Sequence, residues 1–390
     1  FQIFPEVQKL YSARARQLRK IMDAKYARNA AWEAANPEKA ALLKEWFSGK
    51  APRVDWSKVE QKADDSTRSA SAAVLSQLAQ QVPNMICASA DLSNSDKTDG
   101  FLKHTKNMVK GDFSGAFFQA GVSEFTMACC CMGMALHGGV IPACGTFFVF
   151  SDYMKPAVRL AALMGLPVKY VWTHDAFRVG EDGPTHQPVE HEAQIRLMEH
   201  LKNHHGENSM LVLRPADAIE TNIAWKLALE NRTTPTALIL SRQNIKTLPA
   251  PGTTRQDAAA MAARGAYTVT ESDGSPDVIL VASGSEVATL VEAASLLMAD
   301  GIKTRIVSAP SEGLFRLQNE QYRQSVITPD IPVFCLTAGL PVTMLGFAGS
   351  RGKIWGLESF GFSAAYGVLD QKLGFTGGNI AGEVKKFLGR

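Results

Sequence analysis

The sequence predicts an α/β fold with two doubly wound, mostly parallel-sheet domains, preceded by an N-terminal helical connector. Three observations lead to this prediction. At 390 residues, with 46% apolar and 20% charged positions, the chain is long enough for two or three domains with cores of their own. Short apolar runs alternate with helical patterns, which favours parallel sheets covered by helices on both faces. The stretch of residues 247–265, which contains Pro249, Pro251 and Gly252, divides this alternating region and is interpreted as a linker.

Residues 1–60 form the predicted connector. Within residues 1–50, Ala, Lys, Arg and Glu are frequent and apolar residues recur at helical spacing. The sequence Asn36-Pro37-Glu38 is typical of a helix start, so a second helix is expected from that point.

The first predicted α/β domain spans residues 61–250 and the second spans residues 265–390. Strands of the first are expected at Met85–Ala90, Ala116–Gln119, Gly145–Phe150, Val168–Thr173, Met210–Arg214 and Thr236–Leu240. The second is expected to contain strands at Asp277–Ser283, Lys303–Ser308 and Val333–Thr337, with helices at Ser285–Asp300 and Ala381–Leu388.

Charge and hydropathy argue against two classes of partner. The formal net charge of +3 comes from 41 basic and 38 acidic residues spread along the chain, and no Lys/Arg tract is interleaved with stacking aromatics. We therefore expect no nucleic-acid partner. No window approaches the ~20 uninterrupted apolar residues of a membrane span, and the first residues carry neither a signal peptide nor a lipidation motif. The expected location is cytoplasmic, with no membrane partner.

Three of the six cysteines, Cys129, Cys130 and Cys131, are adjacent and lie in the apolar run 122–136. Neighbouring residues of a helix point about 100° apart, so these thiols cannot jointly bind one metal ion. We expect them to be reduced core residues, and we assign no metal ligands in this chain.

The densest group of chemically capable residues lies in the segment Thr173–Glu190, which reads THDAFRVGEDGPTHQPVE. It follows a predicted strand and contains His174, Asp182 and His186 among glycines and a proline, at the sheet edge where open α/β sheets usually bind ligands. Two imidazoles and a carboxylate suit a polyhydroxylated substrate, because they form hydrogen bonds and move protons near neutral pH. From the residues alone, a solvated loop and a metal site remain alternatives, and the residues do not identify the reaction.

Within this segment, GEDGPTHQP at Gly180–Pro188 resembles the transketolase signature. Further segments resemble the same family in the same order: SADL at Ser89–Leu92, ALHGG at Ala135–Gly139, AVRLAALM at Ala157–Met164, PTALILSRQN at Pro235–Asn244 and DVILVASGSEV at Asp277–Val287. The resemblance covers essentially the whole chain. It implies that residues 61–250 are a pyrimidine-binding domain of the thiamine diphosphate type and that residues 265–390 are a transketolase C-terminal domain.

The resemblance implies thiamine diphosphate as cofactor. Glu124, in GVSEFTM, matches the glutamate that hydrogen-bonds the aminopyrimidine ring. Phe147, Phe150 and Tyr153 match the aromatic wall of the pyrimidine pocket, with Phe150 stacking on the ring. Asp91 matches an aspartate near the cofactor at a subunit interface. Without the resemblance, Glu124 would be interpreted as an exposed first-turn residue and the aromatics as a core stripe.

The resemblance also implies a sugar phosphate site and a reaction. His174 and His186 match catalytic histidines that contact the ketose, and Asp182 matches the aspartate that recognises a neighbouring hydroxyl. The residues that match the phosphate grip are Arg68, Ser95 and Arg242, and guanidinium groups suit phosphate oxygens. The implied enzyme is a homodimeric transferase of the pentose phosphate pathway that moves a two-carbon ketol unit from a ketose phosphate to an aldose phosphate.

Three features depart from the family pattern. Ser123 stands where the family usually has Arg, and Leu201–Ser209 looks like a polar surface insertion. The third is the missing GDG motif with its downstream Asn, which in this family binds the diphosphate through Mg²⁺ or Ca²⁺. We therefore expect this chain to be the C-terminal part of a longer enzyme, with the metal and diphosphate ligands in a domain outside it, and to be inactive alone.

Alternatives remain among related enzymes and outside them. Dihydroxyacetone synthase, 1-deoxyxylulose-5-phosphate synthase and the beta subunit of a 2-oxoacid dehydrogenase share the architecture. The two loop histidines and the SRQN sequence favour transketolase over the second and third. A non-catalytic dimerising module is the alternative from another class, and the joint presence of Glu124, His174 and His186 argues against it.

Overall fold

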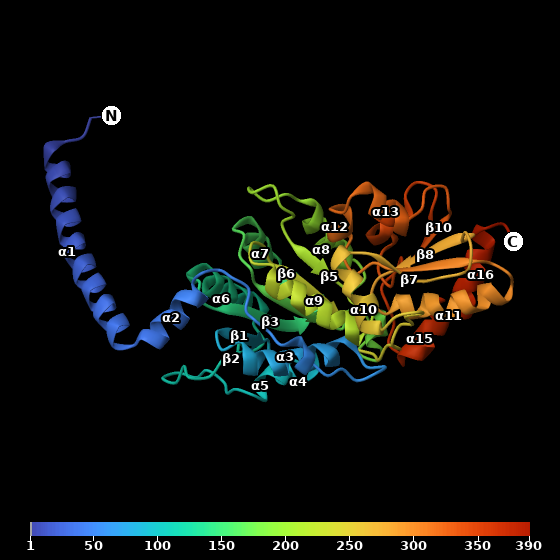
Figure 1. Ribbon diagram of the computed structural model, residues 1–390, viewed down its shortest axis with the longest axis horizontal. Coiled ribbons are helices and arrows are strands. Elements are labelled where there is room, and N and C mark those ends of the chain that lie inside the picture. Colours follow the sequence, from blue (N-terminus) through green and yellow to red (C-terminus); the bar gives the residue numbers. More distant parts are fainter. Residues whose placement is uncertain (1) are drawn as a thin grey trace. The chain divides into compact units, whose positions relative to one another are not determined.

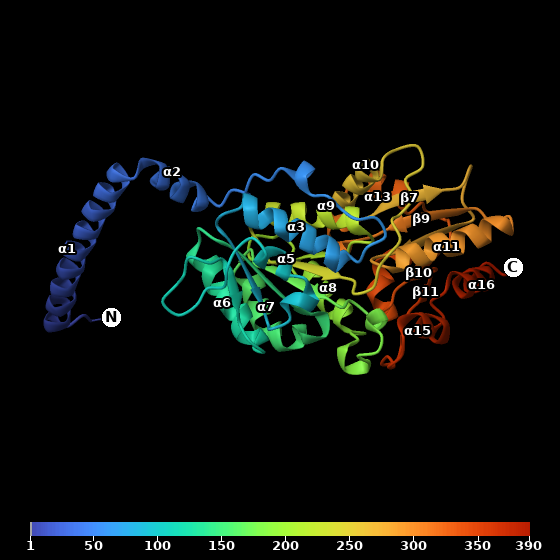
Figure 2. The ribbon, with the colours of Figure 1, turned by 90° about the horizontal axis from the view of Figure 1, so that it is seen from below.

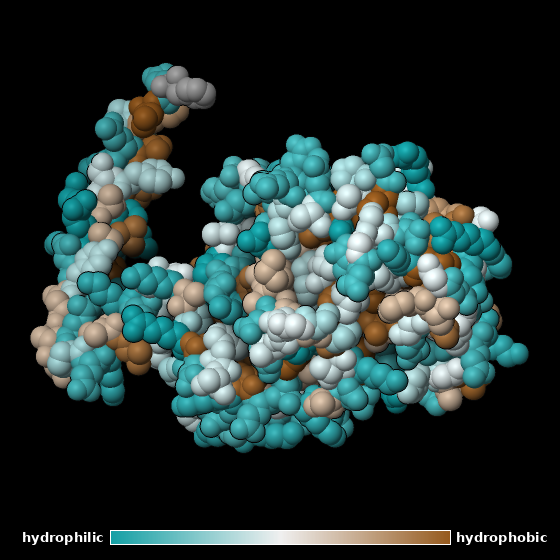
Figure 3. Space-filling model, turned by 45° about the vertical axis from the view of Figure 1, so that its right-hand side comes forward, coloured by the Kyte–Doolittle hydropathy of each residue, from teal (hydrophilic) through white to brown (hydrophobic). Residues whose placement is uncertain are grey.

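The computed structural model describes residues 2–390, and the chain divides at residue 50 into two compact units. In the first unit, α1 (Pro5–Ala35) and α2 (Pro37–Trp46) are separated at Asn36. A residue that precedes proline is disfavoured from helical geometry, so the second helix begins where the sequence predicts. Neither helix has a buried residue, and apolar residues interrupt polar ones along α1 (Figure 3).

The second unit contains two sheets (Figure 1). The first sheet has six strands, all parallel, in the order β2-β1-β3-β4-β6-β5. Their bounds are β1 Met85–Ser89, β2 Phe117–Gln119, β3 Ile141–Phe147, β4 Lys169–Thr173, β5 Leu211–Leu213 and β6 Thr236–Leu240. The predicted strand Gly145–Phe150 is wrong at both ends, because the buried run from Ile141 already pairs with β1 and residues 148–150 form the 3₁₀ turn η2 that leads into a helix.

Helices cover both faces of this sheet. On one face α3 (Thr67–Gln81) and α9 (Ala218–Glu230) bury Val74 and Trp225 with Val171 of β4. On the other, α6 (Glu124–His137) and α7 (Ser151–Leu163) pack with Tyr170 and Trp172 of the same strand. Figure 2 shows the two pairs on opposite sides. The alternation along β4 is the two-residue period of a strand whose faces are both buried. The short helices α4 (Ser93–Asp96) and α5 (Asp99–Leu102) follow β1, and α8 (His191–His200) follows the loop after β4.

The second sheet has five strands in the order β11-β10-β8-β9-β7, namely β7 Tyr267–Glu271, β8 Val278–Ala282, β9 Thr304–Ser308, β10 Val333–Leu336 and β11 Lys353–Trp355. Only the edge strand β7 is antiparallel to its neighbour. On one face lie α11 (Glu286–Ala299) and α16 (Gly377–Phe387), and α13 (Glu320–Val326) and α14 (Leu345–Ala348) lie on the other. Two further helices are α12 (Glu312–Arg316) and α15 (Tyr366–Leu373).

The expected linker, residues 247–265, contains α10 (Arg255–Ala260) and the 3₁₀ turn η5 (Met261–Arg264). This helix has no strong apolar pattern, and polar contacts stabilise it instead. The Thr254 side chain accepts a hydrogen bond from the third residue of the helix. Arg255 forms buried ion pairs with Asp217 and Glu220 at 2.7 and 3.2 Å.

Two expectations about composition can be compared with the fold. Cys131 is buried, but Cys129 is exposed and Cys130 is half-buried, so the prediction that all three are core residues is wrong. The 100° rotation per residue of α6 turns only one of the three thiols toward the sheet. Within residues 2–390, no helix has the length and apolar character that crossing a membrane requires.

Candidate functional site

The carboxyl ends of β3 and β4 bring together three aromatic rings and a histidine. Phe147 ends β3 and lies beside Thr173 in the sheet, so His174 follows at the same edge. The ring of Phe147 stacks on His174, with centroids 3.6 Å apart, and on Phe150 at 5.9 Å. Phe150 in turn stacks on Tyr153 at 6.1 Å. The predicted aromatic residues thus form one continuous stack.

His186 joins this stack from the loop after β4. It ends the 3₁₀ turn η4 (Pro184–His186), and its ring meets the rings of Phe147 and Phe150 edge-on, with centroids 6.1 and 5.4 Å apart. We refer to Phe147, Phe150, Tyr153, His174 and His186 as the aromatic–histidine cluster. Exposure rises from 6% at Phe147 to 63% at Tyr153, so the outer end of the stack is open to a ligand.

His174 is buried and has a left-handed backbone conformation, with φ of +62°. Such strain in a non-glycine residue is often found at functional sites. Its Nε2 lies 3.3 Å from Nη1 of Arg68, and its Nδ1 lies 2.9 Å from Oγ1 of Thr173. Because a guanidinium only donates, Nε2 must accept, and the proton must be on Nδ1. Burial, reinforced by the positive charge of Arg68, lowers the pKa of His174 to about 2, so the ring is neutral near neutral pH.

The two predicted phosphate-binding arginines reach the site from α3 and from the end of β6. Ser241 ties these elements together, because its hydroxyl accepts from the backbone N–H of Thr67 at 3.0 Å and its own N–H donates to Oγ1 of Thr67 at 2.7 Å. Arg68 and Arg242 are the next residues in the two segments. Burial is the main cause that lowers the pKa of Arg68, and the positive charge of Arg242 is the second cause. Because the charge of Arg242 acts on Arg68, the two guanidinium groups together favour an anion.

The remaining predicted residues are less closely joined. Ser95 contributes its backbone carbonyl, which accepts from Nη1 of Arg68 at 2.7 Å, rather than its hydroxyl. Asp182 is exposed in the loop, and its charge partly opposes the lowering of the Arg68 pKa. Asp91 is exposed with φ of +67°, and no hydrogen bond or ion pair in the described chain joins its side chain to the cluster.

Glu124 is the first residue of α6, the helix that packs on β3 and α7. Its side chain is buried, although the residue before it, Ser123, makes no side-chain cap for the helix. Within residues 2–390 we find no hydrogen bond or ion pair to its carboxylate. A carboxylate without a protein partner, on a residue that is otherwise largely buried, can accept a hydrogen bond from a ligand.

Sequence reasoning missed a second set of residues that leave the same loop. Asp175 directly follows His174, Arg178 lies three residues further along the loop, and Arg214 follows β5. We call these three residues, with Glu192 and Glu286, the buried charge network. Arg214 donates to Asp175 from Nε and Nη2 at 3.1 and 2.7 Å, and forms ion pairs with Glu192 and Glu286.

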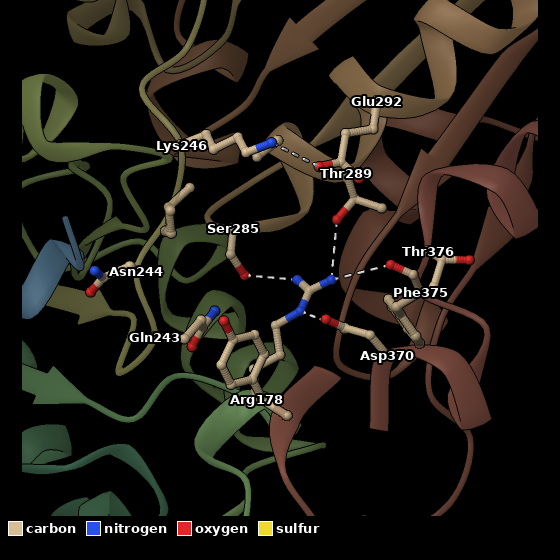
Figure 4. A pocket seen from close by; sticks show the side chains of 13 residues that line it. Arg178, Gln243, Asn244, Lys246, Ser285, Thr289, Glu292, Asp370, Phe375 and Thr376 are labelled. Atoms are coloured by element: carbon tan, nitrogen blue, oxygen red, sulfur yellow. Dashed lines mark hydrogen bonds and ion pairs between the residues drawn. The ribbon is translucent and has the colours of Figure 1, made fainter. Parts of the chain in front are cut away.

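Glu286, the first residue of α11, joins the network to the second sheet's domain. Its carboxylate accepts from Arg178 at 3.2 Å and also pairs with Arg214. Figure 4 shows Arg178 reaching from the loop to Ser285, Thr289 and Asp370 around a cavity of about 240 Å³. The loop that carries the two histidines is therefore fixed to both domains.

Close packing leaves little freedom at this junction. Gly284 has φ of +59°, and a Cβ there would lie 2.7 Å from the guanidinium of Arg214. Gln187 holds the other end of the loop by donating to the carbonyls of Gly180 and Phe362, both at 2.9 Å. The sequence offered one signal for the buried charge network, which is a charged residue directly after an apolar strand, as at Arg214 after Leu213.

Comparison with known families is consistent with this geometry. A model of the transketolase pyrimidine-binding domain matches residues 64–247, and a model of the transketolase-like C-terminal domain matches residues 265–376. Curated transketolases of Geobacillus stearothermophilus and Bacillus subtilis (strain 168) are 42% and 40% identical to the chain over 366 and 370 residues. Each match covers 93% of this chain and 53% of the relative.

Solved structures give the same result. A transketolase from Leishmania mexicana superposes with a TM-score of 0.89 at 33% identity, over all of this chain and 55% of that one. The chain thus spans about half the length of the curated relatives that it matches. With its two sheets, its ordered motifs and these two domain matches, the chain belongs to the transketolase family.

Proposed function

We propose that this chain provides the pyrimidine-binding and sugar-binding parts of a transketolase active site. The complete enzyme would transfer a two-carbon ketol unit from a ketose phosphate to an aldose phosphate. The observation that carries the proposal is the aromatic–histidine cluster, in which an open stack of rings meets one buried and one half-buried imidazole.

The residues present fit the pyrimidine half of thiamine diphosphate. Glu124 offers a carboxylate without a protein partner on a largely buried residue, and Phe150 offers a half-exposed ring face in a stack. When bound, thiamine diphosphate supplies a carbon nucleophile and an electron sink for breaking the bond next to the ketose carbonyl. Glu124 would hold a proton on a pyrimidine ring nitrogen, and Phe150 and Tyr153 would stack on that ring and shield it from water. Asp91 stays a proposed cofactor neighbour.

The chain's own groups would orient the sugar. His174 is neutral, so it can share its hydrogen bonds with hydroxyls without carrying charge into the buried end of the site. His186 lies half-exposed across the same rings and can exchange protons with the substrate oxygen near the carbonyl. Asp182, exposed at the loop, is suited to accept from the next hydroxyl along the sugar.

Arg68 would couple phosphate binding to this orientation. In the described chain Nη1 of Arg68 donates a hydrogen bond to Nε2 of His174, which is the acceptor that a sugar hydroxyl would use. A phosphate held between Arg68 and Arg242 attracts that guanidinium away from the imidazole. Nε2 of His174 is then free to accept from the sugar only when the phosphate end of the substrate is bound. Ser95 contacts Arg68 at the same place.

Metal and diphosphate ligands are proposed to lie outside this chain. The sequence has no GDG motif with a downstream Asn, and the predicted site residues include no set of oxygen ligands suited to Mg²⁺ or Ca²⁺. The exposed apolar residues Val122, Phe125 and Leu136, on and beside α6, support a homodimer. Alone, the chain is expected to be inactive and to bind the cofactor weakly.

The test completes the chain with the part of the Bacillus subtilis relative that lies outside the match. A coupled assay with xylulose 5-phosphate and ribose 5-phosphate should give turnover for the completed protein and none for the 390-residue chain. Glu124→Gln should lower kcat of the completed protein at least about 100-fold. A completed protein that folds, binds cofactor and still shows no ketol transfer would refute the proposal.

Calorimetric titration checks the cofactor half of the proposal separately. The 390-residue chain should bind thiamine diphosphate with Mg²⁺ much more weakly than the completed protein, because the phosphate and metal contacts are missing. Equal affinity for the two proteins contradicts the assignment of those contacts to another domain. Asp330→Asn, an exposed change in the second sheet's domain, serves as the matched control and should alter neither measurement.

A further inference from the structure

A second group of chemically capable side chains lies where α7 and α8 begin, among residues to which the proposed function gives no role. Asp152 is the second residue of α7, Glu190 directly precedes α8, and His191 is the first residue of α8. One ligand atom from each residue lies within 4.8 Å of the other two. Within residues 2–390 no other three His, Cys, Asp or Glu side chains meet in this way.

His191 is the unusual member of this group. It is 3% exposed, and neither ring nitrogen has a hydrogen-bond partner in the described chain. Its ring lies edge-on to the buried ring of Phe148. Nε2 lies 3.2 Å from Oδ2 of Asp152, and Nδ1 lies 3.6 Å from Oε2 of Glu190. The imidazole is thus held between two carboxylates without being aligned to donate to either.

This separation is compatible with a shared metal ion as well as with an ion pair. Two ligands bound at about 2.0–2.1 Å to one tetrahedral ion lie about 3.3 Å apart, off the direct hydrogen-bond line. The 3.2 Å between Nε2 of His191 and Oδ2 of Asp152 agrees with that value. Glu190 follows on the same loop and can turn its half-exposed carboxylate toward the same point.

The surroundings support a metal ligand role for Asp152. Its other oxygen, Oδ1, pairs with Nζ of Lys155 at 2.5 Å, and Lys155 is held in turn by Gln194. Metal-binding carboxylates usually have such an outer partner, which fixes the free oxygen in place. The side chains of Asp152 and Glu190 are 46% and 36% exposed, which leaves a route for the ion and room for a water ligand.

We propose that Asp152, Glu190 and His191 bind a divalent transition metal ion, with Zn²⁺ as the reference ion. An imidazole with two carboxylates suits Zn²⁺, whereas Ca²⁺ and Mg²⁺ prefer oxygen ligands alone. The ion joins the start of α7 to the start of α8. Tyr153 follows Asp152, and the loop bearing His186 runs into α8, so the ion clamps the two segments on either side of the aromatic–histidine cluster.

The test uses the 390-residue chain with Cys129→Ser and Cys130→Ser, which remove the accessible thiols. Calorimetric titration with Zn²⁺ at pH 7.5 should give one ion per chain. His191→Asn should weaken binding at least about 100-fold, and Asp152→Asn and Glu190→Gln about 10-fold each. His204→Asn with His205→Asn, on the exposed loop, is the matched control and should bind like the parent. A large excess of Mg²⁺ or Ca²⁺ should not displace the ion.

Two results would overturn the proposal. The first is no Zn²⁺ binding by the parent, the double serine variant, and the second is unchanged binding by His191→Asn. If the unsubstituted chain binds Zn²⁺ and the parent does not, the ion sits on surface thiols. Circular dichroism without metal tests whether His191→Asn folds. If it does not, the exposed Asp152→Asn decides, because its loss of affinity cannot come from a collapsed core.

Discussion

The loop from His174 to His186 belongs to two regions with opposite physical character. In the aromatic–histidine cluster, ring stacking dominates and the outer rings are open. In the buried charge network, Asp175 and Arg178 from the same loop are surrounded by ion pairs and hydrogen bonds. One side of the loop is therefore accessible to a ligand, and the other side fixes the position of the loop.

The network is better understood as a positioning device than as a source of net stability. Bringing charges out of water costs about as much as their attraction returns, so a buried ion pair adds little overall. Removing one partner is expensive, because the other charge stays buried and unpaired. Network variants should therefore change stability strongly, and cluster variants should change binding more than stability.

The largest expected effect is that of Glu286→Gln. This carboxylate pairs with both Arg178 and Arg214 and also accepts from the backbone N–H of Ala338 at 3.3 Å. Its neutralisation should lower the free energy of unfolding by about 3 kcal/mol. Urea unfolding of the 390-residue chain, followed by tryptophan fluorescence, measures the change.

The matched control for Glu286→Gln is Asp330→Asn. Asp330 pairs with Arg351 at 3.1 Å, but the two side chains are 88% and 84% exposed. An exposed pair contributes little because water screens it, so the urea midpoint should not move measurably. Equal shifts for the two variants would mean that the buried network does not hold the domains together.

Acid should weaken the fold through His174. Its pKa is about 2 in the folded chain, below the value of about 6.5 in an unfolded chain. Between these values the unfolded chain binds a proton that the folded chain cannot, so stability falls as the pH falls below 6.5. Arg68, Arg242 and His186 face the imidazole and oppose its protonation. His174→Asn should remove up to about 1.4 kcal/mol of the loss per pH unit.

The pH measurement compares urea unfolding at pH 7.5 and pH 5.5. His205→Asn, an exposed histidine on another loop, should leave the pH dependence of the parent unchanged. If His174→Asn loses as much stability as the parent on acidification, His174 is not buried in its neutral form. The buried end of the aromatic–histidine cluster would then not exclude charge.

Phe150→Ala should change cofactor binding more than stability. The ring is half-exposed in the stack, so its removal should cost little stability. Stacking on a flat heterocycle contributes about 1 kcal/mol, so KM for thiamine diphosphate in the completed protein should rise about fivefold. Met298→Ala, exposed on α11, is the control. A stability loss without a change in KM would identify Phe150 as a structural residue only.

Much of the fold could be predicted because its strands are buried on both faces. Continuous apolar runs such as Val278–Ala282 appear in the sequence as strands of a parallel sheet. The edge strands β7 and β11 escaped prediction for the opposite reason. Tyr267–Glu271 alternates buried with partly exposed residues, and Lys353–Trp355 is short and has no buried residue. The other two edge strands, β2 and β5, lie in apolar runs and were predicted, so a weak local pattern rather than edge position explains the two that were missed.

The site shows the same division. His174 and His186 lie in one short segment, which identified them together, and Phe147 was assigned through the resemblance. Arg214 and Glu286 are far from Asp175 in sequence, and a buried charge looks like an exposed one until the fold brings its partner near. Ion pairs between distant segments therefore have no local signature. The roles given to Glu124, Asp91 and Asp182 remain predictions, because geometry alone assigns no role in a reaction.

The smallest expected effect concerns the proton on His174. Oγ1 of Thr173 is buried, and in the described chain its one hydrogen-bond partner is Nδ1 of His174 at 2.9 Å. Thr173→Val keeps the shape but removes the acceptor, which should cost about 1 kcal/mol, whereas Thr173→Ser should retain most of it. Since Arg68 still donates to Nε2, the proton should stay on Nδ1, and ¹⁵N NMR should show Nε2 unprotonated in all three proteins. A protonated Nε2 in the parent would mean that Arg68 does not occupy this nitrogen, and the proposed coupling between phosphate binding and His174 would fail with it.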